Sequence, residues 1–558
     1  MLFSNFRSAV RVFSRRAYHF KLGLATAILM AIFLYLSHDK RTSLSWTPLP
    51  PLSYELFFQG LDEYVVKAPS LKDRYKADKV ESRGSNQDEF LFSKEYLENV
   101  LDISDETLQL LKQSHHGYVH KHMDNLIKES KIATFGIVRP ESPEWKTYKK
   151  SAGYVIIGGG KYSWLSYLVV KQIRSIGGTL PIEVFIPSEK EYEEKFCKEV
   201  LPKYDAVCNV LDVDVMKSVA ENFKIGGYQF KMLAILTSKF ENVMYLDSDL
   251  FPTRNPEYIF DSDLYKEKGL LLWPDHWART TNPKFHEIAE YPVLETKVRY
   301  SKYDKKQAES KGESLKPLSE FTFKDSNFHD FQNALPDPSS EAGILVVNKT
   351  SHLRTMLLAL YYNLLGPDYY YPLMTQGGAG EGDKETFIAA ASVMGEPYHQ
   401  TAKSFAWVGY HSQDEKSFVS KALGHYDPLV LDPEAPNNIT FLHCSYPKYY
   451  TDWFYNNHDL IYKDEKTHIR MYEGIYNNVG YDVDLKFQQN FVQGVCKGYY
   501  KDGKAVDSDI REEDEWAGNF LKYIGDDLEA NNKRCAEVYL PHLKWLKETT
   551  KFPNTLTQ

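Results

Sequence analysis

The sequence is poor in cysteine. Its 558 residues include five cysteines, and no C-x-x-C pair or His/Cys cluster has the spacing of a structural zinc site. Five cysteines allow two disulfides and one leftover thiol if the chain folds in an oxidising compartment. Cys197 and Cys208 flank a short loop and are the first candidate pair. A structural zinc is therefore disfavoured, and a disulfide is expected at that loop.

The chain also lacks the excess of basic residues that nucleic-acid-binding proteins carry. Its 67 Lys and Arg against 76 Asp and Glu give a formal charge of −9. Five of the bases lie in the first 21 residues, which contain no acid, so the remainder has 62 bases against 76 acids, or −14. A polyanion-binding protein shows the opposite balance, and we expect no nucleic-acid partner.

Long apolar runs are scarce as well, with one at residues 22–36. Its 15 uncharged residues fall short of the roughly 20 needed to cross a bilayer, but extension back to Ala17 reaches that length. The alternative is a cleaved signal peptide. It is disfavoured because the small residues that could form a cleavage site, Ala25 and Ala27, lie inside the apolar run, and because the residues that follow the run are charged. The preceding cations predict a cytoplasmic tail (1–16), a signal-anchor (17–36) and a lumenal remainder, and the short span favours an early secretory membrane.

No internal repeat or low-complexity tract organises the chain. Residues 37–150 are polar, begin with a Pro-rich stretch and are predicted to form a stem with helices within 93–130. From residue 151 short apolar strands alternate with helical periodicity, which predicts an α/β catalytic domain (151–450) with a mainly parallel sheet. A mostly helical extension is expected over 451–558. The expected strands are 154–157, 182–186, 206–211 and 242–246, and the expected helices 164–177, 189–201 and 228–240.

Asp247 and Asp249 directly follow the strand 242–246. In such sheets ligands gather at the carboxyl ends of the strands. Residues i and i+2 at a strand end point the same way, so these carboxylates can bind one hard divalent cation, which would neutralise a substrate diphosphate. Four other D-x-D pairs read better as solvated turns: Asp212/Asp214, Asp261/Asp263, Asp482/Asp484 and Asp507/Asp509.

Three single side chains are further candidates, each with a structural alternative. Lys231, on the helix before that strand, could reach a donor, but a lone helix lysine more often faces solvent. His443, five residues before Lys448, could complete the metal site, although imidazole is softer than a manganese or magnesium site usually takes. Glu341, which opens the strand 344–347, suits a sugar hydroxyl or a plain strand entry.

A glycine-rich run, 377–387, carries several ionisable residues at a helix start. Its glycines permit close approach of the backbone to a ligand. Asp383 could contact a substrate or serve as an ordinary N-cap. The two roles are compatible, because helix starts commonly line binding sites.

Several motifs together resemble a known family. Residues 228–249, with Lys231 ahead of the Asp247-Ser248-Asp249 motif, resemble retaining nucleotide-sugar transferases of the GT-A fold. The wider set looks like the fungal α-1,2-mannosyltransferases that add branching mannoses to the outer chain of cell-wall mannan (glycosyltransferase family 71). Its motifs are Gly158–Trp164, Leu272–Asp275, Leu335–Pro338, Tyr369–Leu373 and Gly380–Phe387.

The resemblance implies a GT-A-like fold, GDP-mannose as donor, Mn²⁺ as cofactor, and an α-mannose acceptor on the mannan outer chains of N-glycans. It also implies the Golgi membrane as location, with other Golgi mannosyltransferases as partners in a complex. The site residues it implies are, for the metal, Asp247, Asp249 and His443; for catalysis, Asp383, Glu385 and Glu341; for the donor, Gly158, Gly159, Tyr162, Lys231, Asp247 and Lys448; and for the acceptor, Trp273, Asp275 and Glu381.

An α-linked product from GDP-α-mannose means retention of configuration. No residue is an obvious nucleophile, so front-face attack, with a donor phosphate oxygen taking the acceptor proton, is favoured over a double displacement. The alternatives are an α-1,3-transferase of the same family and a non-catalytic lumenal regulator on a GT-A frame. Two sequons, at Asn348 and Asn438, are candidate N-glycosylation sites of a lumenal chain.

Overall fold

Two β-sheets carry most of the residues singled out above. The computed structural model describes residues 52–81, 90–130, 132–140, 148–219, 223–413, 416–464, 466–501, 504–505 and 516–552. The large sheet contains β1(Val138–Pro140), β2(Ala152–Ile157), β3(Ile182–Ile186), β4(Ala206–Leu211), β5(Asn242–Leu246), β7(Leu270–Pro274), β8(Ser340–Asn348) and β9(His399–Gln400). The small sheet contains β6(Leu250–Pro252), β10(Ala406–His411), β11(Phe418–Tyr426) and β12(Ile439–His443).

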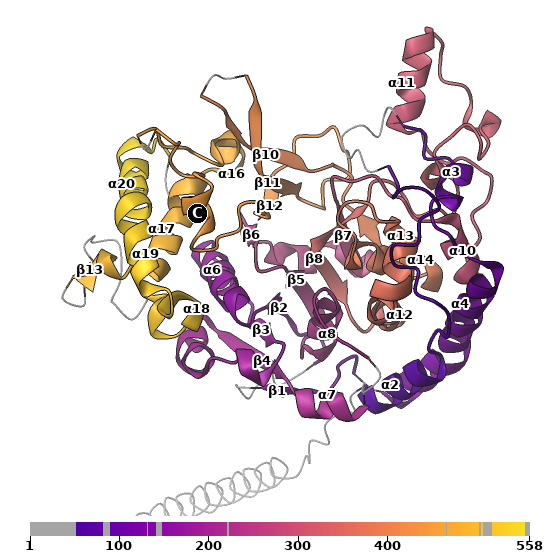
Figure 1. Ribbon diagram of the computed structural model, residues 1–558, viewed down its shortest axis with the longest axis horizontal. Helices are drawn as coiled ribbons and strands as arrows, with labels where there is room; N and C mark the ends of the chain where they lie inside the picture. The colour runs from indigo at the N-terminus through magenta and orange to yellow at the C-terminus, as the bar shows by residue number, and fades with distance from the viewer. Residues whose placement is uncertain are drawn as a thin grey trace, which may run out of the picture. The chain divides into compact units, whose positions relative to one another are not determined.

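The large sheet is mainly parallel, and the sequence-based expectation is confirmed. Its strand order is β1-β4-β3-β2-β5-β8-β7-β9. The strands β4, β3, β2 and β5 run parallel, β8 runs antiparallel between β5 and β7, and β9 is parallel to β7. The small sheet, in the order β10-β11-β12-β6, is antiparallel throughout. Figure 1 shows both sheets.

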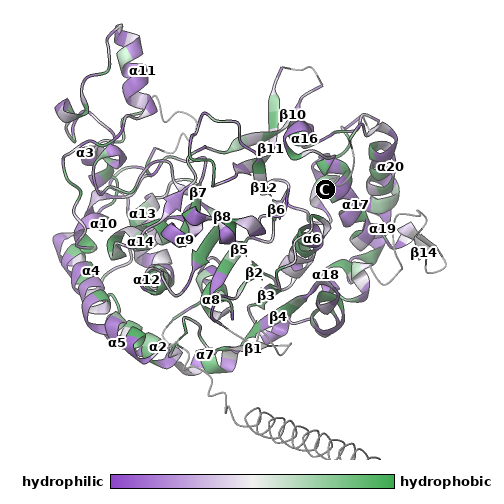
Figure 2. Ribbon diagram, turned by 180° about the vertical axis from the view of Figure 1, so that it is seen from behind, coloured by the Kyte–Doolittle hydropathy of each residue, from purple (hydrophilic) through white to green (hydrophobic). Residues whose placement is uncertain are grey.

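Alternating residues of each central strand enter two different hydrophobic cores. In β5, Met244 and Leu246 join one core, whereas Val243 and Tyr245 join the other. Side chains alternate across a strand, so a sheet covered on both faces needs this double burial. Residues 243–246 are therefore buried one after another along β5, and the central strands are drawn partly in green in Figure 2.

Two layers of helices cover the two faces of the sheet (Figure 1). The helices that pack into the first core are α6(Lys161–Ser175), α9(Asp263–Lys268), α15(Trp453–Asn456), α16(Tyr476–Val479), α17(Val483–Val495), α18(Lys522–Gly525) and α20(Leu540–Thr549). Those that pack into the second core are α2(Tyr54–Glu63), α4(Asp105–Gly117), α5(Met123–Glu129), α7(Val213–Val219), α8(Gln229–Thr237), α10(Pro283–Ile288), α12(Leu353–Leu364), α13(Tyr371–Thr375) and α14(Thr386–Met394). Other helices of the described chain are α3(Lys94–Glu98), α11(Lys302–Lys311) and α19(Leu528–Arg534).

The predicted stem, 37–150, is corrected over its described part. Phe57 and Phe58 of α2 are fully buried, and they share a core with Leu233 of α8 and Leu357 of α12. The prediction rested on the polar composition of this segment. Its helices are amphipathic, however, and bury a narrow apolar stripe against the core. The segment from residue 52 is therefore part of the folded body.

Both membrane-related predictions lie outside the described residues. The cytoplasmic tail (1–16) and the signal-anchor (17–36) fall before residue 52, where the described chain begins. Among the described residues, no helix combines the length and apolar character needed to cross a bilayer. The two predictions stay predictions.

Disulfides fasten two of the peripheral segments. Cys197 is bonded to Cys208, as expected from the short loop between them, and Cys496 is bonded to Cys535. The fifth cysteine, Cys444, is buried and forms no disulfide with the other cysteines, all of which are described. The helix expected over 189–201 is instead a series of short irregular turns, since Cys197 is tied back to β4 and Pro202 follows closely.

Phe57→Ala should destabilise the whole protein. The ring contacts Phe58, Tyr118 and Phe135, so its loss leaves a cavity in the shared core and should lower the free energy of unfolding by about 3–5 kcal/mol. Gln59→Ala, on the exposed face of the same helix, should change it by less than about 0.5 kcal/mol. Denaturant unfolding of the purified protein measures both. Equal stability of the two variants would mean that α2 is not part of the core.

Candidate active site

A cavity of about 500 Å³ lies at the carboxyl ends of β5 and β7. Asp247 follows β5, Asp275 follows β7, and His443 ends β12 of the small sheet. The loop 380–384 closes another side. Ligands of open α/β sheets bind at this edge, so the cavity is the expected position for a substrate.

The predicted metal residues converge at this cavity. Asp247, Asp249 and His443 each offer one ligand atom, and these atoms lie within 4.8 Å of one another. Asp249 is 4% exposed, and its Oδ1 lies 3.5 Å from Nε2 of His443. Two carboxylates and one imidazole can together hold a divalent cation, with the carboxylates supplying the hard ligands and the imidazole a softer one.

Two lysines bracket the acidic pair. Nζ of Lys448 contacts Oδ2 of Asp249, while Nζ of Lys231 lies 3.5 Å from Oδ1 of Asp247 and 3.0 Å from Oδ2 of Asp383. Burial disfavours the charged form of Lys231, but Asp247 and Asp383 outweigh it, so the pKa of Lys231 is raised above its ordinary value. Both ammonium groups therefore stay charged beside the position where a diphosphate would meet the aspartates.

Glu341 is held by two histidines. Its Oε2 lies 3.1 Å from Nδ1 of His443 and 3.2 Å from Nε2 of His425, and its Oε1 accepts a hydrogen bond from the backbone N–H of Gly343 at 2.5 Å. Although burial opposes ionisation, His443 and His425 hold the pKa of Glu341 well below its ordinary value. This carboxylate is thus ionised and already bound by neighbouring groups.

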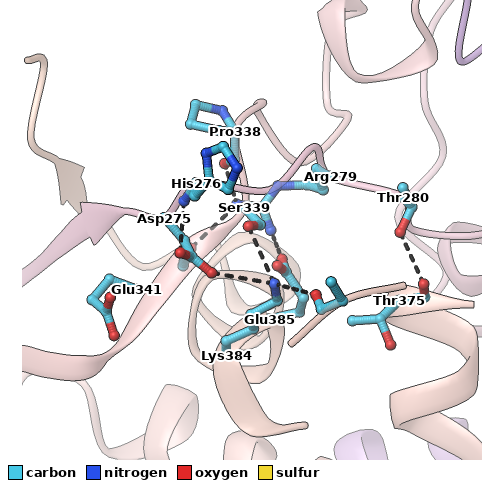
Figure 3. Close-up of polar contacts among 12 residues, drawn as sticks. Asp275, His276, Arg279, Thr280, Pro338, Ser339, Glu341, Thr375, Lys384 and Glu385 are labelled. Atoms are coloured by element: carbon cyan, nitrogen blue, oxygen red, sulfur yellow. Dashed lines mark hydrogen bonds and ion pairs between the residues drawn. The ribbon is translucent and has the colours of Figure 1, made fainter. Parts of the chain in front are cut away.

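A second buried pair lies on the far side of the cavity. Nζ of Lys384 is 3.3 Å from Oδ2 of Asp275, 3.4 Å from Oγ of Ser339 and 3.0 Å from the carbonyl oxygen of Ala379 (Figure 3). Burial raises the pKa of Asp275 and lowers the pKa of Lys384, although the pairing of the two works against both shifts. Polar groups of both signs therefore face this end of the cavity.

Comparison with known proteins identifies the family of the chain. The Mannosyl_trans3 family model, which describes a mannosyltransferase, matches residues 151–427. The α-1,2-mannosyltransferase MNN2 of Candida albicans is 54% identical over 510 residues, which cover 90% of this chain and 85% of that protein. The chain belongs to the fungal α-1,2-mannosyltransferase family.

Other matches are more distant. The α-1,2-mannosyltransferase MNN2 of Saccharomyces cerevisiae is 40% identical over 342 residues, 61% of this chain and 53% of that protein. Among solved structures, the galactosyltransferase LgtC in complex with donor and acceptor sugar analogs matches 45% of this chain and 74% of that chain, with 12% identity and a TM-score of 0.26. A superposition this loose does not define a common fold for the mannosyltransferase.

Two of the implied site residues do not reach the cavity. The carboxylate of Glu385 is buried in an ion pair with Arg279 (Figure 3), and Glu385 does not line the cavity. Trp273 is fully buried in the first core, and its indole N–H donates to the carbonyl oxygen of Tyr426 at 2.8 Å. These positions correct the catalytic role expected of Glu385 and the acceptor contact expected of Trp273.

The other implied residues lie at or near the cavity. Glu381 lines it, but its Oε2 already accepts hydrogen bonds from Thr375 and Gly377, each at 2.8 Å. Gly158 and Gly159 lie in the turn between β2 and α6, and the exposed Tyr162 lies at the start of α6. None of the three lines the cavity. Their donor role stays a prediction.

Asp383 lines the cavity and does not cap a helix. It begins a short 3₁₀ turn, η10(Asp383–Glu385), and the N-cap position of α14 is Glu385, which makes no side-chain capping bond. Burial raises the pKa of Asp383, while Lys231 works against that shift. Of the two alternatives left open by the sequence, the structure excludes the capping one.

The two sequons differ in accessibility. Nδ2 of Asn348 donates to Oδ1 of Asn242 at 2.9 Å, and Oδ1 of Asn348 accepts from the N–H of Ser351 at 2.9 Å. Asn438 is exposed. A glycan on Asn348 would replace an existing hydrogen bond, so Asn438 is the better acceptor of the two.

Several residues at or behind the cavity were missed by the sequence interpretation. They are His425, which holds Glu341, and the cavity residues Lys384, Trp277, Trp407 and Tyr446. The strands β10 and β11 were not expected, so His425 and Trp407 had no predicted neighbours. Lys384 lies inside the glycine-rich motif, and that motif was the signal that could have indicated it.

Glu385→Gln should impair folding more than ligand binding. Removing the charge leaves Arg279 buried without its partner and should lower the free energy of unfolding by about 3–5 kcal/mol. Asp383→Asn is the matched variant; it should cost less stability, because Lys231 keeps Asp247 as a partner, and reduce mannosyl transfer more. Thermal unfolding and turnover of both variants test this. Normal stability with lost turnover in Glu385→Gln would restore its catalytic role.

Proposed function

We propose that this protein is a retaining α-1,2-mannosyltransferase that transfers mannose from GDP-mannose to α-mannose residues of mannan outer chains. The observation that carries the proposal is the clustering of Asp247, Asp249 and His443 with Lys231 and Lys448; all except the buried Asp249 line one cavity. Acids for a cation and lysines for a diphosphate are what a nucleotide-sugar donor requires. The family of the chain supplies the sugar and the linkage, and a GT-A frame fits the mainly parallel sheet.

The proposed cofactor is Mn²⁺, held by Asp247, Asp249 and His443. When bound, a divalent cation neutralises the diphosphate and stabilises it as a leaving group. Lys448, which contacts Asp249, and Lys231, which contacts Asp247, are placed to bind the phosphate oxygens. The burial of Lys231 keeps water away from its ammonium group and strengthens its contact with a phosphate.

The carboxylates in the cavity favour front-face attack over a covalent intermediate. A nucleophile must present an uncommitted oxygen to the anomeric carbon. Both oxygens of Glu341 are bound, by His443, His425 and the N–H of Gly343, and Asp383 is paired with Lys231. A phosphate oxygen of the donor is therefore the proposed acceptor of the proton from the attacking hydroxyl.

The proposed location is the Golgi membrane, with the catalytic body in the lumen and a complex with other Golgi mannosyltransferases as its setting. Two disulfides in the described chain support an oxidising compartment. The exposed sequon at Asn438 agrees with it.

Asp249→Asn is the sharpest test of the proposal. The purified protein is incubated with GDP-mannose, Mn²⁺ and short α-mannosides, and the linkage of the product is determined. Turnover should fall by more than the roughly 10–100-fold typical of a residue behind a metal ligand. GDP and Mn²⁺ together should raise the melting temperature of the native protein and not that of the variant.

Asp261→Asn is the matched control, because Asp261 belongs to another D-x-D pair and is exposed. It should leave turnover and the ligand-induced shift unchanged. Retained turnover in Asp249→Asn would refute the metal assignment. An α-1,3-linked product would contradict the proposed α-1,2 linkage but not the proposed metal and donor site.

A further inference from the structure

The register of the small sheet places three side chains in one row. Trp407 of β10 pairs with Leu423 of β11, which pairs with His443 of β12. Opposite residues of antiparallel strands share a face. All three line the 500 Å³ cavity, whereas Val408, the next residue of β10, belongs to the buried core. Neighbouring strands lie about 4.8 Å apart, so the Cα atoms of Trp407 and His443 are roughly 10 Å apart.

Trp407 is 48% exposed although it lines a cavity. Its ring packs edge to face against His276, with centroids 4.6 Å apart and an angle of 69°, so it lies beside Asp275 and two strands away from the predicted metal ligand. A large aromatic side chain left open at such a position indicates a binding surface. The diphosphate would lie at the metal residues, which leaves the surface at Trp407 available to the other substrate.

A second cavity, of about 720 Å³, lies at the far end of the same hairpin. Its wall is rich in aromatic rings. They belong to Tyr410 of β10, to Phe418 of β11, to Trp545 of α20, and to Tyr462. Phe418 is 46% exposed. Figures 1 and 2 both show β10 beside α16, with α20 at the same end of the molecule. Nothing in the proposed transfer reaction uses this cavity.

Lys421 lies between an aromatic ring of the first cavity and one of the second. It lines the first one, and its ammonium group lies 5.6 Å from the ring centre of Tyr446 in the first cavity and 6.0 Å from that of Tyr410 in the second. An ion pair with Asp459, 2.6 Å long, fixes its position. Along β10, Trp407 and His411 are four residues apart, or roughly 13 Å, so a short polymer spans the distance.

We propose that the acceptor is bound as an oligomannoside chain, with the reacting mannose on Trp407 and the preceding residues in the second cavity. The C–H groups on one face of a pyranose ring pack on aromatic rings, while its hydroxyls need the polar groups between them. Arg470 also lines the second cavity, but its guanidinium already donates to the carboxylate of Asp482 at 2.6 Å. It is therefore not available to bind a phosphate group with both of its N–H sides. The inference rests on the proposed mannosyl transfer.

The test compares acceptors of two lengths. Phe418→Ala should raise KM for a hexamannoside roughly 3- to 10-fold and leave the kinetics with a dimannoside unchanged, because the dimannoside does not reach the second cavity. Trp407→Ala should raise KM for both acceptors and leave KM for GDP-mannose unchanged. Leu431→Ala is the matched control; Leu431 is 59% exposed, lies outside both cavities and should change nothing.

Binding of the hexamannoside alone, measured by NMR titration of the native protein and of Phe418→Ala, separates the two proposals. Weaker binding in Phe418→Ala supports the second cavity even if no mannose is transferred to any acceptor, in which case only the proposed function fails. Equal binding by the two proteins, or equal effects of Phe418→Ala on short and long acceptors, would overturn the inference.

Discussion

The imidazole of His443 lies between two buried carboxylates, Asp249 and Glu341, and the rest of the site depends on this contact. Asp249 follows a strand of the large sheet, Glu341 begins another, and His443 ends a strand of the small sheet. Isolated carboxylates at such depth would be protonated or would repel one another. The cationic groups around them keep the acids ionised, so the same charges that could hold a cation and a diphosphate also join the two sheets.

The surrounding fold keeps these charges in place. β5 is hydrogen-bonded on one side to the parallel strand β2 and on the other to the antiparallel strand β8. Each strand is buried on both faces, by α6 and the C-terminal helices on one and by α8, α12 and the N-terminal helices on the other. Tyr245 of β5 donates to Oδ1 of Asp247 at 2.6 Å, so even the less buried acid is oriented by the core.

The features that sequence could predict are those set by local patterns. The strands β3, β4 and β5 appear with their expected bounds, because a short apolar run between turn signals leaves little freedom. Asp247, Asp249 and the first disulfide follow from the same local reading. His425 and Trp407 could not be predicted, because their roles arise from the pairing of β10, β11 and β12, which joins residues distant in sequence. The stem prediction failed since polar helices were judged by composition and not by their buried stripe.

The double burial of β5 also limits how this chain can vary. If one residue were inserted before Asp247 and the aspartates kept their positions, every side chain at the end of β5 would point into the opposite core. Leu246 would then occupy the position of Tyr245. Neither core has room for that exchange. Insertions and deletions can be accommodated only where the backbone leaves the sheets. Differences in length among such enzymes should therefore lie in the loops that contact the acceptor, while the spacing from β5 to its two aspartates stays constant.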